Sequence, residues 1–312
     1  MQNNIVKIFS GSNTRLLAES IAKQYGQPLS ECVIQRFSDG EIQPNILESL
    51  RGASVFFIQS TPPPAENLLE LLLLIDAARR ASAGYITAVM PYYGMARQDR
   101  KDKPRVSIGS KMVANILAEV GADRVITMDL HADQIQGFFD IPVDHLHASS
   151  VFIPYIKQLN LQNLTFATPD VGGTKRARMY AKHFNVEMVI CDKQRKRANE
   201  IESMTVIGDV NGKDVVIIDD LCDTGGTLCN AAALMMEKGA TSVRAFCTHP
   251  VLSGNAHINI ENSKMTEMVV TDSIPLKQHN KKLKVISVDQ IFATTIRNVL
   301  ESKSISSLFI DN

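Results

Sequence analysis

The sequence has 312 residues, a length that suggests about two domains, each able to bury a substantial core. Lys plus Arg and Asp plus Glu number 33 each, so bulk charge gives no sign of a nucleic-acid or membrane-surface partner. The most apolar stretch, residues 68–75, is interrupted by Glu70 and is too short to span a bilayer, and the N-terminus lacks the apolar run of a secretory signal. We therefore expect a globular, cytoplasmic protein.

Short apolar runs rich in β-branched residues alternate with helical patterns along the whole chain. The first half predicts strands at 5–10, 55–59, 85–91 and 124–129, and helices at 13–25, 65–83 and 107–120. The second half predicts strands at 164–168, 186–191, 214–219, 242–247, 268–271 and 285–287, and helices at 174–184, 226–238 and 289–301. This alternation is typical of mostly parallel sheets covered by helices on both faces, so the predicted fold class is α/β.

The strands at 124–129 and 214–219 both end in acidic residues, a weak internal echo that indicates two similar domains. We place them at residues 1–147 and 148–312, although no linker rich in Gly, Ser or Pro separates them. The last helix and the tail are expected to pack back on the N-terminal domain.

The five cysteines are odd in number and contain no C-x-x-C pair, which argues against zinc and against a disulfide framework. We expect free thiols at Cys32, Cys191, Cys222, Cys229 and Cys247, as in a reducing cytosol.

The run VVIIDDLCDTGGT, residues 215–227, predicts a buried strand, two acids, a short loop and a helix start. A glycine-rich turn at a helix N-terminus presents backbone N–H groups and a partial positive charge, which suit a phosphate. Carboxylates repel phosphate but accept hydrogen bonds from sugar hydroxyls, so the run predicts a sugar-phosphate site. The members of this site are Asp219, Asp220, Asp223, Thr224, Gly225, Gly226 and Thr227. The alternative is an ordinary strand-to-helix loop with Asp223 or Thr224 as the helix cap.

This run matches the phosphoribosyl-binding motif of the type I phosphoribosyltransferase fold. Three further segments resemble class I ribose-phosphate pyrophosphokinase: DLHADQIQGFF at 129–139, FSDGE at 37–41 and PYYGMARQDR at 91–100. The resemblance covers essentially the whole chain, including THPVLSG at 248–254 and the tail from residue 304 to residue 309. It implies two phosphoribosyltransferase-like domains and transfer of the diphosphoryl group of ATP to the 1-hydroxyl of ribose 5-phosphate, with Mg²⁺ as cofactor.

Asp170 opens DVGGT, residues 170–174, where the resemblance places a pyrophosphate loop of Asp170, Gly172, Gly173 and Thr174. It also implies that Asp170 and His131 are metal contacts, and the alternative for Asp170 is a capping residue. Because Mg²⁺ prefers oxygen and keeps its waters, contact with His131 through a phosphate or a water is an alternative to direct ligation. The other histidines, at 145, 147, 183, 249, 257 and 279, are taken as structural.

The segment KQRKRAN, residues 193–199, is strongly charged and predicts a mobile loop. The resemblance implies a catalytic loop in which Lys193 and Arg195 stabilise charge on the transferred group, with Arg195 also near the sugar phosphate. Many relatives carry Arg and Pro where this chain has Gln194 and Lys196. The simpler interpretation is a solvated charge run.

The resemblance assigns ATP binding to Phe37, Asp39, Gly40, Glu41, Arg97 and Gln98, with the first four contributed by a neighbouring subunit. It therefore implies an oligomer, commonly a homohexamer. A regulatory anion site, at which inorganic phosphate activates and ADP inhibits, aligns with Ser49, Arg51, Ser82, Ser304 and Ser306.

Two alternatives stay open. A phosphoribosyltransferase would consume phosphoribosyl pyrophosphate instead of forming it, and a regulatory paralogue of the same fold would lack activity. The second domain with an ATP-type loop argues against the first, and the intact Lys193, Arg195, His131 and Asp170 argue against the second.

Overall fold

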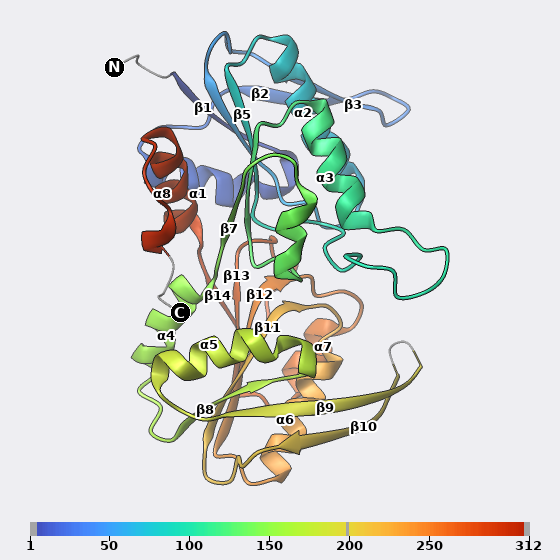
Figure 1. The fold of residues 1–312 in the computed structure, drawn as a ribbon, viewed down its shortest axis with the longest axis vertical. Helices are drawn as coiled ribbons and strands as arrows, with labels where there is room; N and C mark the ends of the chain where they lie inside the picture. Colours follow the sequence, from blue (N-terminus) through green and yellow to red (C-terminus); the bar gives the residue numbers. More distant parts are fainter. Residues whose placement is uncertain (1–4, 198–199, 309–312) are drawn as a thin grey trace. The chain divides into compact units, whose positions relative to one another are not determined.

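The computed structural model describes residues 5–197 and 200–308, with side-chain positions for these except 193–203 and 307. The chain divides into two compact units (Figure 1). Among the described residues, unit 1 comprises 5–147, 273–275 and 287–308, and unit 2 comprises the rest of 148–286.

Unit 1 is built on a parallel sheet with the strand order β1-β4-β5-β6-β7. These strands are β1 Val6–Ser10, β4 Ser54–Ile58, β5 Tyr85–Met90, β6 Arg124–Met128 and β7 Val143–Leu146. A separate antiparallel hairpin is formed by β2 (Cys32–Arg36) and β3 (Ile42–Ile46).

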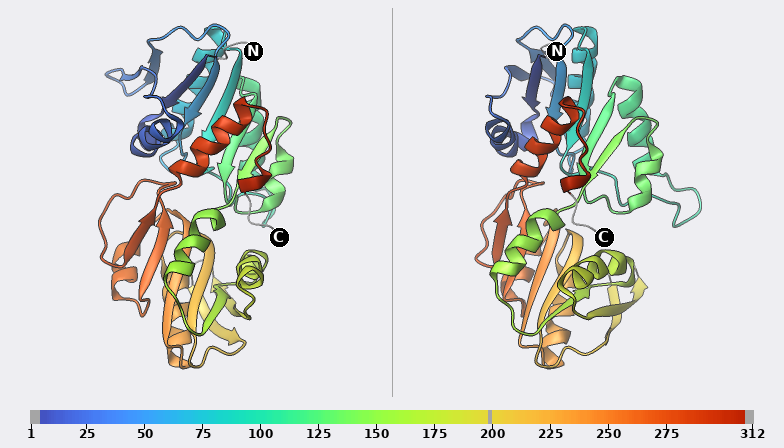
Figure 2. Two further views of the ribbon diagram at one scale, coloured as in Figure 1. Left: turned by 90° about the vertical axis from the view of Figure 1, so that its left-hand side faces the viewer. Right: turned by 60° about the vertical axis from the view of Figure 1, so that its left-hand side comes forward.

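Helices cover both faces of this sheet because its central strands are apolar on both sides. The helices are α1 Arg15–Tyr25, α2 Glu66–Arg80, α3 Gly109–Val120 and α8 Asp289–Leu300, with short 3-10 turns η1 Ser12–Thr14, η2 Asp133–Phe138 and η4 Ser306–Leu308. Val55 and Phe57 join the core beneath α2 and α3, whereas the alternate residue Phe56 is equally buried outside that core. Helices α1 and α8 lie side by side (Figure 2), where Arg297 Nη2 donates to Tyr25 O at 2.8 Å.

Unit 2 is built on a larger sheet with the strand order β10-β9-β8-β11-β12-β13-β14, parallel except for β10. Its strands are β8 Leu164–Thr168, β9 Met188–Arg197, β10 Glu200–Ile207, β11 Asp214–Cys222, β12 Ser242–Pro250, β13 Glu267–Thr271 and β14 Leu283–Ile286. Its helices are α4 Ser149–Gln158, α5 Thr174–Phe184, α6 Gly226–Glu237 and α7 Ala256–Asn262, with the 3-10 turn η3 Val171–Gly173.

Alternating side chains of the central strands pack against different helices of unit 2. Phe166 and Phe246 contact rings of α5 and α4, at Tyr180 and Phe152 respectively. The neighbouring residue Ala167 belongs instead to the core that α6 completes. This two-sided packing makes the strand ends of the sheet a fixed platform for the loops that follow them.

Several elements differ from the sequence prediction. The pattern predicts a loop from Lys193, but the backbone through Arg197 continues β9 and pairs antiparallel with β10. A backbone ladder forms whatever the side-chain charge, and charged residues are common on strands near a sheet edge. The sequence also gives no signal for β2, β3 and β7, or for α4 and α7. Helix α4 contains Pro154, which normally breaks helices, and α7 is only 7 residues long.

All five cysteines are free thiols. Within the described ranges, no helix has both the length and the apolar character needed to cross a membrane.

Candidate functional site

The acids of the predicted sugar-phosphate segment lie inside strand β11, because that strand continues to Cys222. Strand β8 pairs with β11 only as far as Ile217, whereas β12 accompanies it to the end. Asp219 and Asp220 therefore extend beyond the neighbouring strand, at the carboxyl edge where ligands of parallel sheets bind.

The turn after β11 is held by the segment that follows β12. Ser253 N donates to Asp223 O at 3.0 Å, and Asn259 Nδ2 donates to Thr224 O at 2.9 Å. Gly225 caps α6 with φ +75°, a left-handed conformation that favours glycine. The first N–H groups of an α-helix have no partner within the helix, so α6 presents donors and a partial positive charge at Gly226 and Thr227.

The loop after β8 is similarly shaped around Asp170. Gly173 N donates to Asp170 Oδ1 at 3.2 Å, and Thr168 Oγ1 donates to Asp170 O at 2.7 Å. A Cβ at Gly173 would lie 2.4 Å from Thr168 Oγ1, so only glycine fits there. Because β8 and β11 are parallel neighbours, this loop and the Asp219–Gly226 segment project from the same edge of one sheet.

An ion pair joins the two loops of unit 2. Arg176 Nη1, in the first turn of α5, lies 3.2 Å from Asp220 Oδ1, and both side chains are largely buried. Sequence reasoning did not single out Arg176, because its partner is distant along the chain. A weak signal was nevertheless available: an arginine in the first turn opposes the helix dipole, which favours an acidic partner beside it.

Burial raises the pKa of Asp219 well above its ordinary value, and the adjacent charge of Asp220 raises it further. Asp220 N also donates to Asp219 Oδ1 at 2.9 Å. Asp170 contributes to the same crowding of negative charge. A cation would relieve this repulsion, and carboxylate oxygens are the ligands that Mg²⁺ prefers, so the donor set fits that ion.

The two residues predicted to be catalytic lie on β9, where Lys193 is paired with Met204 and Arg195 with Ile201. Their side chains lie outside the described part of the structure. Strand β9 is a parallel neighbour of β8, and Thr168, the last residue of β8, pairs with Ile190. The part of β9 that carries Lys193 and Arg195 therefore extends beyond the end of β8, in a hairpin with β10.

The FSDGE segment forms the turn of the β2–β3 hairpin. Gly40 has φ +97°, Gly40 N donates to Phe37 O at 2.9 Å, and Glu41 N donates to Asp39 Oδ1 at 3.0 Å. Phe37 is 49% exposed although it is large and apolar. Figures 1 and 2 show the hairpin tip apart from the loop that follows β5, so one chain does not bring the predicted ATP residues together.

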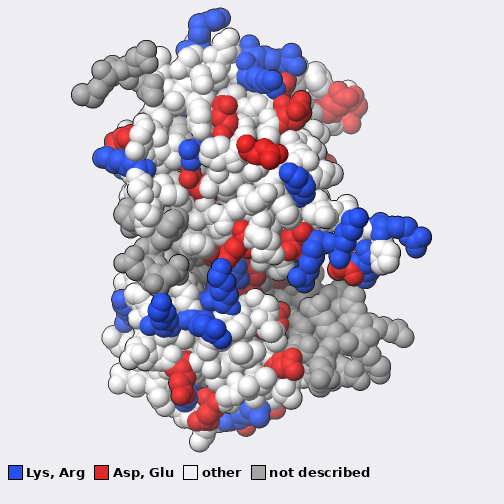
Figure 3. All heavy atoms as spheres, in the orientation of Figure 1, with Lys and Arg blue, Asp and Glu red and all other residues white. Residues whose placement is uncertain are grey.

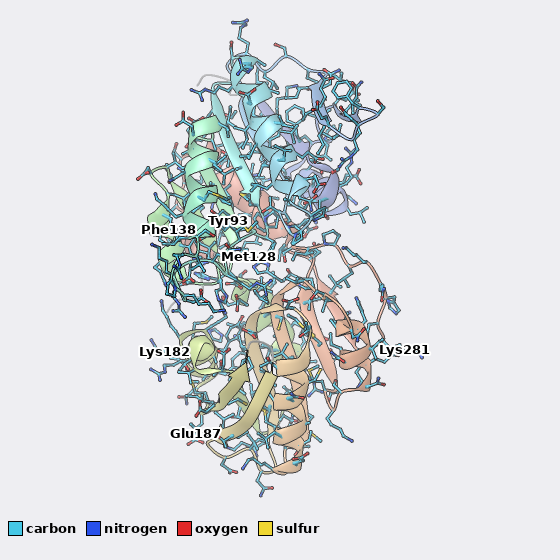
Figure 4. The ribbon with its side chains drawn as sticks, turned by 90° about the vertical axis from the view of Figure 1, so that its right-hand side faces the viewer. Tyr93, Met128, Phe138, Lys182, Glu187 and Lys281 are labelled. Carbon is cyan, nitrogen blue, oxygen red and sulfur yellow. The ribbon has the colours of Figure 1, made fainter. Side chains whose placement is uncertain are left out.

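The loop between β5 and α3 is anchored by buried aromatic residues and carries exposed basic residues. Tyr93 OH donates to Ser110 O at 2.7 Å, and the Tyr93 ring contacts Phe139. Figure 4 shows Tyr93, in the loop after β5, and Met128, the last residue of β6, on the same side of unit 1. Figure 3 shows Lys and Arg side chains gathered over the projecting part of the loop. The exposed cations are Arg97, Arg100, Lys101, Lys103 and Arg105.

Gln98, predicted to bind ATP, makes hydrogen bonds within the loop that precedes α3 and to the first turn of that helix. Its Oε1 accepts from Ser107 Oγ at 3.2 Å, and its backbone oxygen accepts from Ser110 Oγ at 3.1 Å. A Cβ at Gly109 would lie 2.6 Å from Gln98 Oε1. Gln98 thus holds the start of α3, although its side chain, like that of its neighbour Arg97, is exposed.

His131 follows the end of β6 directly after Asp129 and Leu130. Asp129 is buried with φ +36°, and it contacts His147, while Leu130 N donates to His145. His145 and His147, taken from the sequence as structural, therefore lie beside a proposed metal contact. They escape sequence reasoning because their proximity arises only when β6 and β7 pair.

The predicted regulatory residues form two groups in unit 1. Gly52 N, next to Arg51, donates to Ser82 O at 2.8 Å, and Ser304 Oγ lies 2.6 Å from Ser306 Oγ. Figure 2 shows the loop between α2 and β5 apart from the tail that follows α8. A single anion site made from both groups would therefore need more than one chain.

These features define an α/β protein whose carboxyl-edge loops suit a phosphorylated sugar and a diphosphate. The model for the N-terminal domain of ribose phosphate pyrophosphokinase matches residues 6–121, and the model for the phosphoribosyl synthetase-associated domain matches residues 192–310.

Curated relatives match nearly the full chain. The ribose-phosphate pyrophosphokinase of Porphyromonas gingivalis is 56% identical over 99% of this chain and 98% of its own, and that of Campylobacter jejuni is 53% identical over 97% and 99%. The crystal structure of phosphoribosylpyrophosphate synthetase from Mycobacterium smegmatis superposes with a TM-score of 0.91 and 37% identity, covering 96% of this chain and 100% of that one. The chain belongs to the ribose-phosphate pyrophosphokinase family, and the predicted family and α/β fold class are confirmed.

Proposed function

We propose that the chain transfers the β,γ-diphosphoryl group of ATP to ribose 5-phosphate, giving 5-phosphoribosyl 1-pyrophosphate and AMP. The observation that carries the proposal is the shared edge of β8 and β11, from which two carboxylates, a glycine-containing loop and the start of α6 project. Family membership at 56% identity over nearly the full length supports the same reaction.

Within unit 2, each part of the edge has a defined task. The start of α6, from Thr224 to Thr227, binds the 5-phosphate, because its N–H groups and the helix dipole attract an anion. Asp219 and Asp220 accept hydrogen bonds from the ribose hydroxyls. The loop from Asp170 to Thr174, closed around Gly172 and Gly173, then receives the diphosphate attached at C1.

In the reaction, the 1-hydroxyl oxygen of the sugar bonds to the β-phosphorus of ATP. The bond from that phosphorus to the bridging oxygen of the α-phosphate breaks, AMP leaves with the oxygen, and the hydroxyl proton passes to water. Lys193 and Arg195 stabilise the charge that develops on the transferred group. Asp170 and His131 are the residues that would hold Mg²⁺, which supplies neutralisation of the phosphate charges.

ATP binding uses Arg97 and Gln98 of one chain and the tip of the β2–β3 hairpin of another. The separation of these two regions in unit 1 and the exposure of Phe37 support this shared arrangement. We infer a homohexamer in the cytoplasm. Inorganic phosphate activates and ADP inhibits at an anion site built from Ser49, Arg51, Ser82, Ser304 and Ser306 of more than one chain.

The test is incubation of the purified protein with ATP, ribose 5-phosphate and Mg²⁺, with and without inorganic phosphate, and separation of the nucleotides by chromatography. The proposal predicts AMP that depends on the sugar phosphate. A phosphoribosyltransferase would instead release pyrophosphate from added phosphoribosyl pyrophosphate and a base, and a regulatory paralogue would form neither product. Either of those results contradicts the proposal.

A further inference from the structure

The backbone bends sharply at Asp129, immediately after β6. Its φ of +36° lies in the left-handed region, which costs most residues with a side chain roughly 1–2 kcal/mol and which Asn and Asp adopt more readily than others. Such strained residues persist only where surrounding contacts determine them, and they concentrate at functional sites. This bend sets the direction in which the next residues, Leu130 and His131, leave the sheet.

Three hydrogen bonds from β7 and the residue after it hold the bend. Asp129 N donates to Leu146 O at 2.9 Å, and Leu130 N donates to His145 Nε2 at 2.9 Å. His147 Nδ1 lies 3.2 Å from Asp129 Oδ1. Asp129 and His145 are each only 6% exposed, so these bonds are sheltered from water.

The partners fix the protonation of both imidazoles. A backbone N–H can only donate, so Nε2 of His145 carries the lone pair and its proton lies on Nδ1. The Asp129 carboxylate accepts, so Nδ1 of His147 carries a proton. Candidate ligand atoms of Asp129, His145 and His147 lie within 4.8 Å of one another, but these bonds occupy Nε2 of His145 and Nδ1 of His147. One nitrogen of each imidazole is therefore used in a hydrogen bond that holds the bend.

We propose that His145 and His147 are positioning residues that hold the Asp129 bend and thereby aim His131 at the metal ion. The inference rests on the proposed function, in which His131 is a metal contact. It deepens that function because it assigns a task to two histidines outside the reacting groups. Loss of either brace lets the bend relax, and His131 then leaves the orientation that the metal needs.

The experiment measures Mn²⁺ binding to the full-length protein by the EPR signal of the free ion, without any turnover. His145→Leu and His147→Leu should each weaken Mn²⁺ affinity about tenfold, the lower end of the effect of outer partners on metal sites. His145→Gln places an oxygen acceptor near the position of Nε2, and His147→Asn places an N–H donor near Nδ1. Both of these variants should retain affinity close to that of the wild type.

His279→Leu, at an exposed histidine of unit 2, is the matched control and should not change the affinity. Melting temperatures identify any variant that fails to fold. If His145→Leu fails to fold, the His147 variants still test the inference, because the His147 side chain is half-exposed. Unchanged affinity in folded Leu variants overturns the inference, as does equal loss in the Gln and Asn variants. Tight Zn²⁺ binding that His147→Leu abolishes would also overturn it, because the trio would then be a metal centre.

The AMP assay of the wild type decides the proposed function separately. If AMP forms but the Leu variants bind Mn²⁺ normally, the positioning inference alone fails. If His131→Ala binds Mn²⁺ as tightly as the wild type, or if the wild type shows no specific Mn²⁺ binding, His131 is not a metal contact and the inference falls with that assignment. If the brace variants lose Mn²⁺ and the wild type forms no AMP, the inference stands and the proposed reaction fails.

Discussion

The two units share a parallel-sheet scaffold but differ at the carboxyl edges of their strands. In unit 2, the loops after β8 and β11 are short, contain glycines and end in helix starts that present backbone donors. In unit 1, side chains satisfy the loop backbone: Thr61 Oγ1 accepts from Gly94 N at 2.8 Å, and His145 accepts from Leu130 N. One architecture therefore supports two tasks. The unit 2 edge is shaped to receive anions, whereas the unit 1 edge is braced internally and carries side chains outward.

The largest effect is expected at Lys193, on the hairpin that extends from the unit 2 sheet. Lys193→Ala should lower kcat by roughly two to three orders of magnitude, because a cation that acts on the transition state is lost. The KM for ribose 5-phosphate should change little. Steady-state kinetics test this, with Lys281→Ala as control because Lys281 points outward from unit 2 (Figure 4). Normal turnover in the Lys193 variant would remove that residue from the mechanism.

Gly173 tests the claim that the unit 2 edge depends on close backbone approach. Gly173→Ala should lower kcat/KM about tenfold or more and destabilise the protein by about 1–3 kcal/mol, because the new Cβ would lie 2.4 Å from Thr168 Oγ1. Gly172→Ala meets only Asp170 Oδ1, at 3.2 Å, and should have a smaller effect on stability. Urea unfolding and kinetics of the two variants provide the measurement, and equal stability losses would contradict the steric explanation.

Asp220 tests the sugar end of the same edge. Asp220→Ala should raise the KM for ribose 5-phosphate about tenfold, the size of one lost hydrogen bond to a charged group, and leave the KM for ATP nearly unchanged. It also removes the buried ion pair between Asp220 and Arg176, so a lower melting temperature is expected. Asp209→Ala, at an exposed acid of unit 2, serves as control. An unchanged sugar-phosphate requirement would count against the diol contact.

The smallest effect is expected at Asp219, where the substitution should raise the stability of the protein instead of lowering it. Because burial raises its pKa in the folded state, the protonated carboxyl stabilises the fold in acid, and this contribution is lost as the pH rises through the folded pKa. At pH 7.5, Asp219→Asn should therefore have a free energy of unfolding about 1 kcal/mol higher than the wild type, a size typical of single substitutions, and should unfold at a higher temperature. The difference should shrink towards pH 4, near the ordinary pKa of Asp at about 3.9. A variant less stable than the wild type at pH 7.5 would show that the carboxylate contributes net stabilisation.

Sequence patterns predicted the unit 2 edge better than the unit 1 edge. The residues of the 215–227 run are consecutive, so β-branched periodicity, adjacent acids and glycines identify strand, acids and turn without any tertiary information. The strand boundary was wrong by three residues, because pairing with β12 extends β11 to Cys222.

Long-range contacts account for the rest. Arg176 and Asp220 are far apart in sequence, and His145 meets Leu130 only after β6 and β7 align. The prediction of a loop from Lys193 was wrong for the same reason, because local sequence patterns do not show the pairing of β9 with its antiparallel partner β10. Composition and periodicity report what a segment can form by itself, and they omit the partner that decides between alternatives.

The central claim is that the unit 2 edge receives a diphosphate from ATP on C1 of a sugar phosphate. The most direct measurement uses ATP labelled with ³²P at the γ-phosphorus, with ribose 5-phosphate and Mg²⁺, and follows the label by chromatography. The label should appear in 5-phosphoribosyl 1-pyrophosphate, with one labelled molecule for each AMP formed. Label in inorganic phosphate, or in a sugar product formed together with ADP, would contradict it.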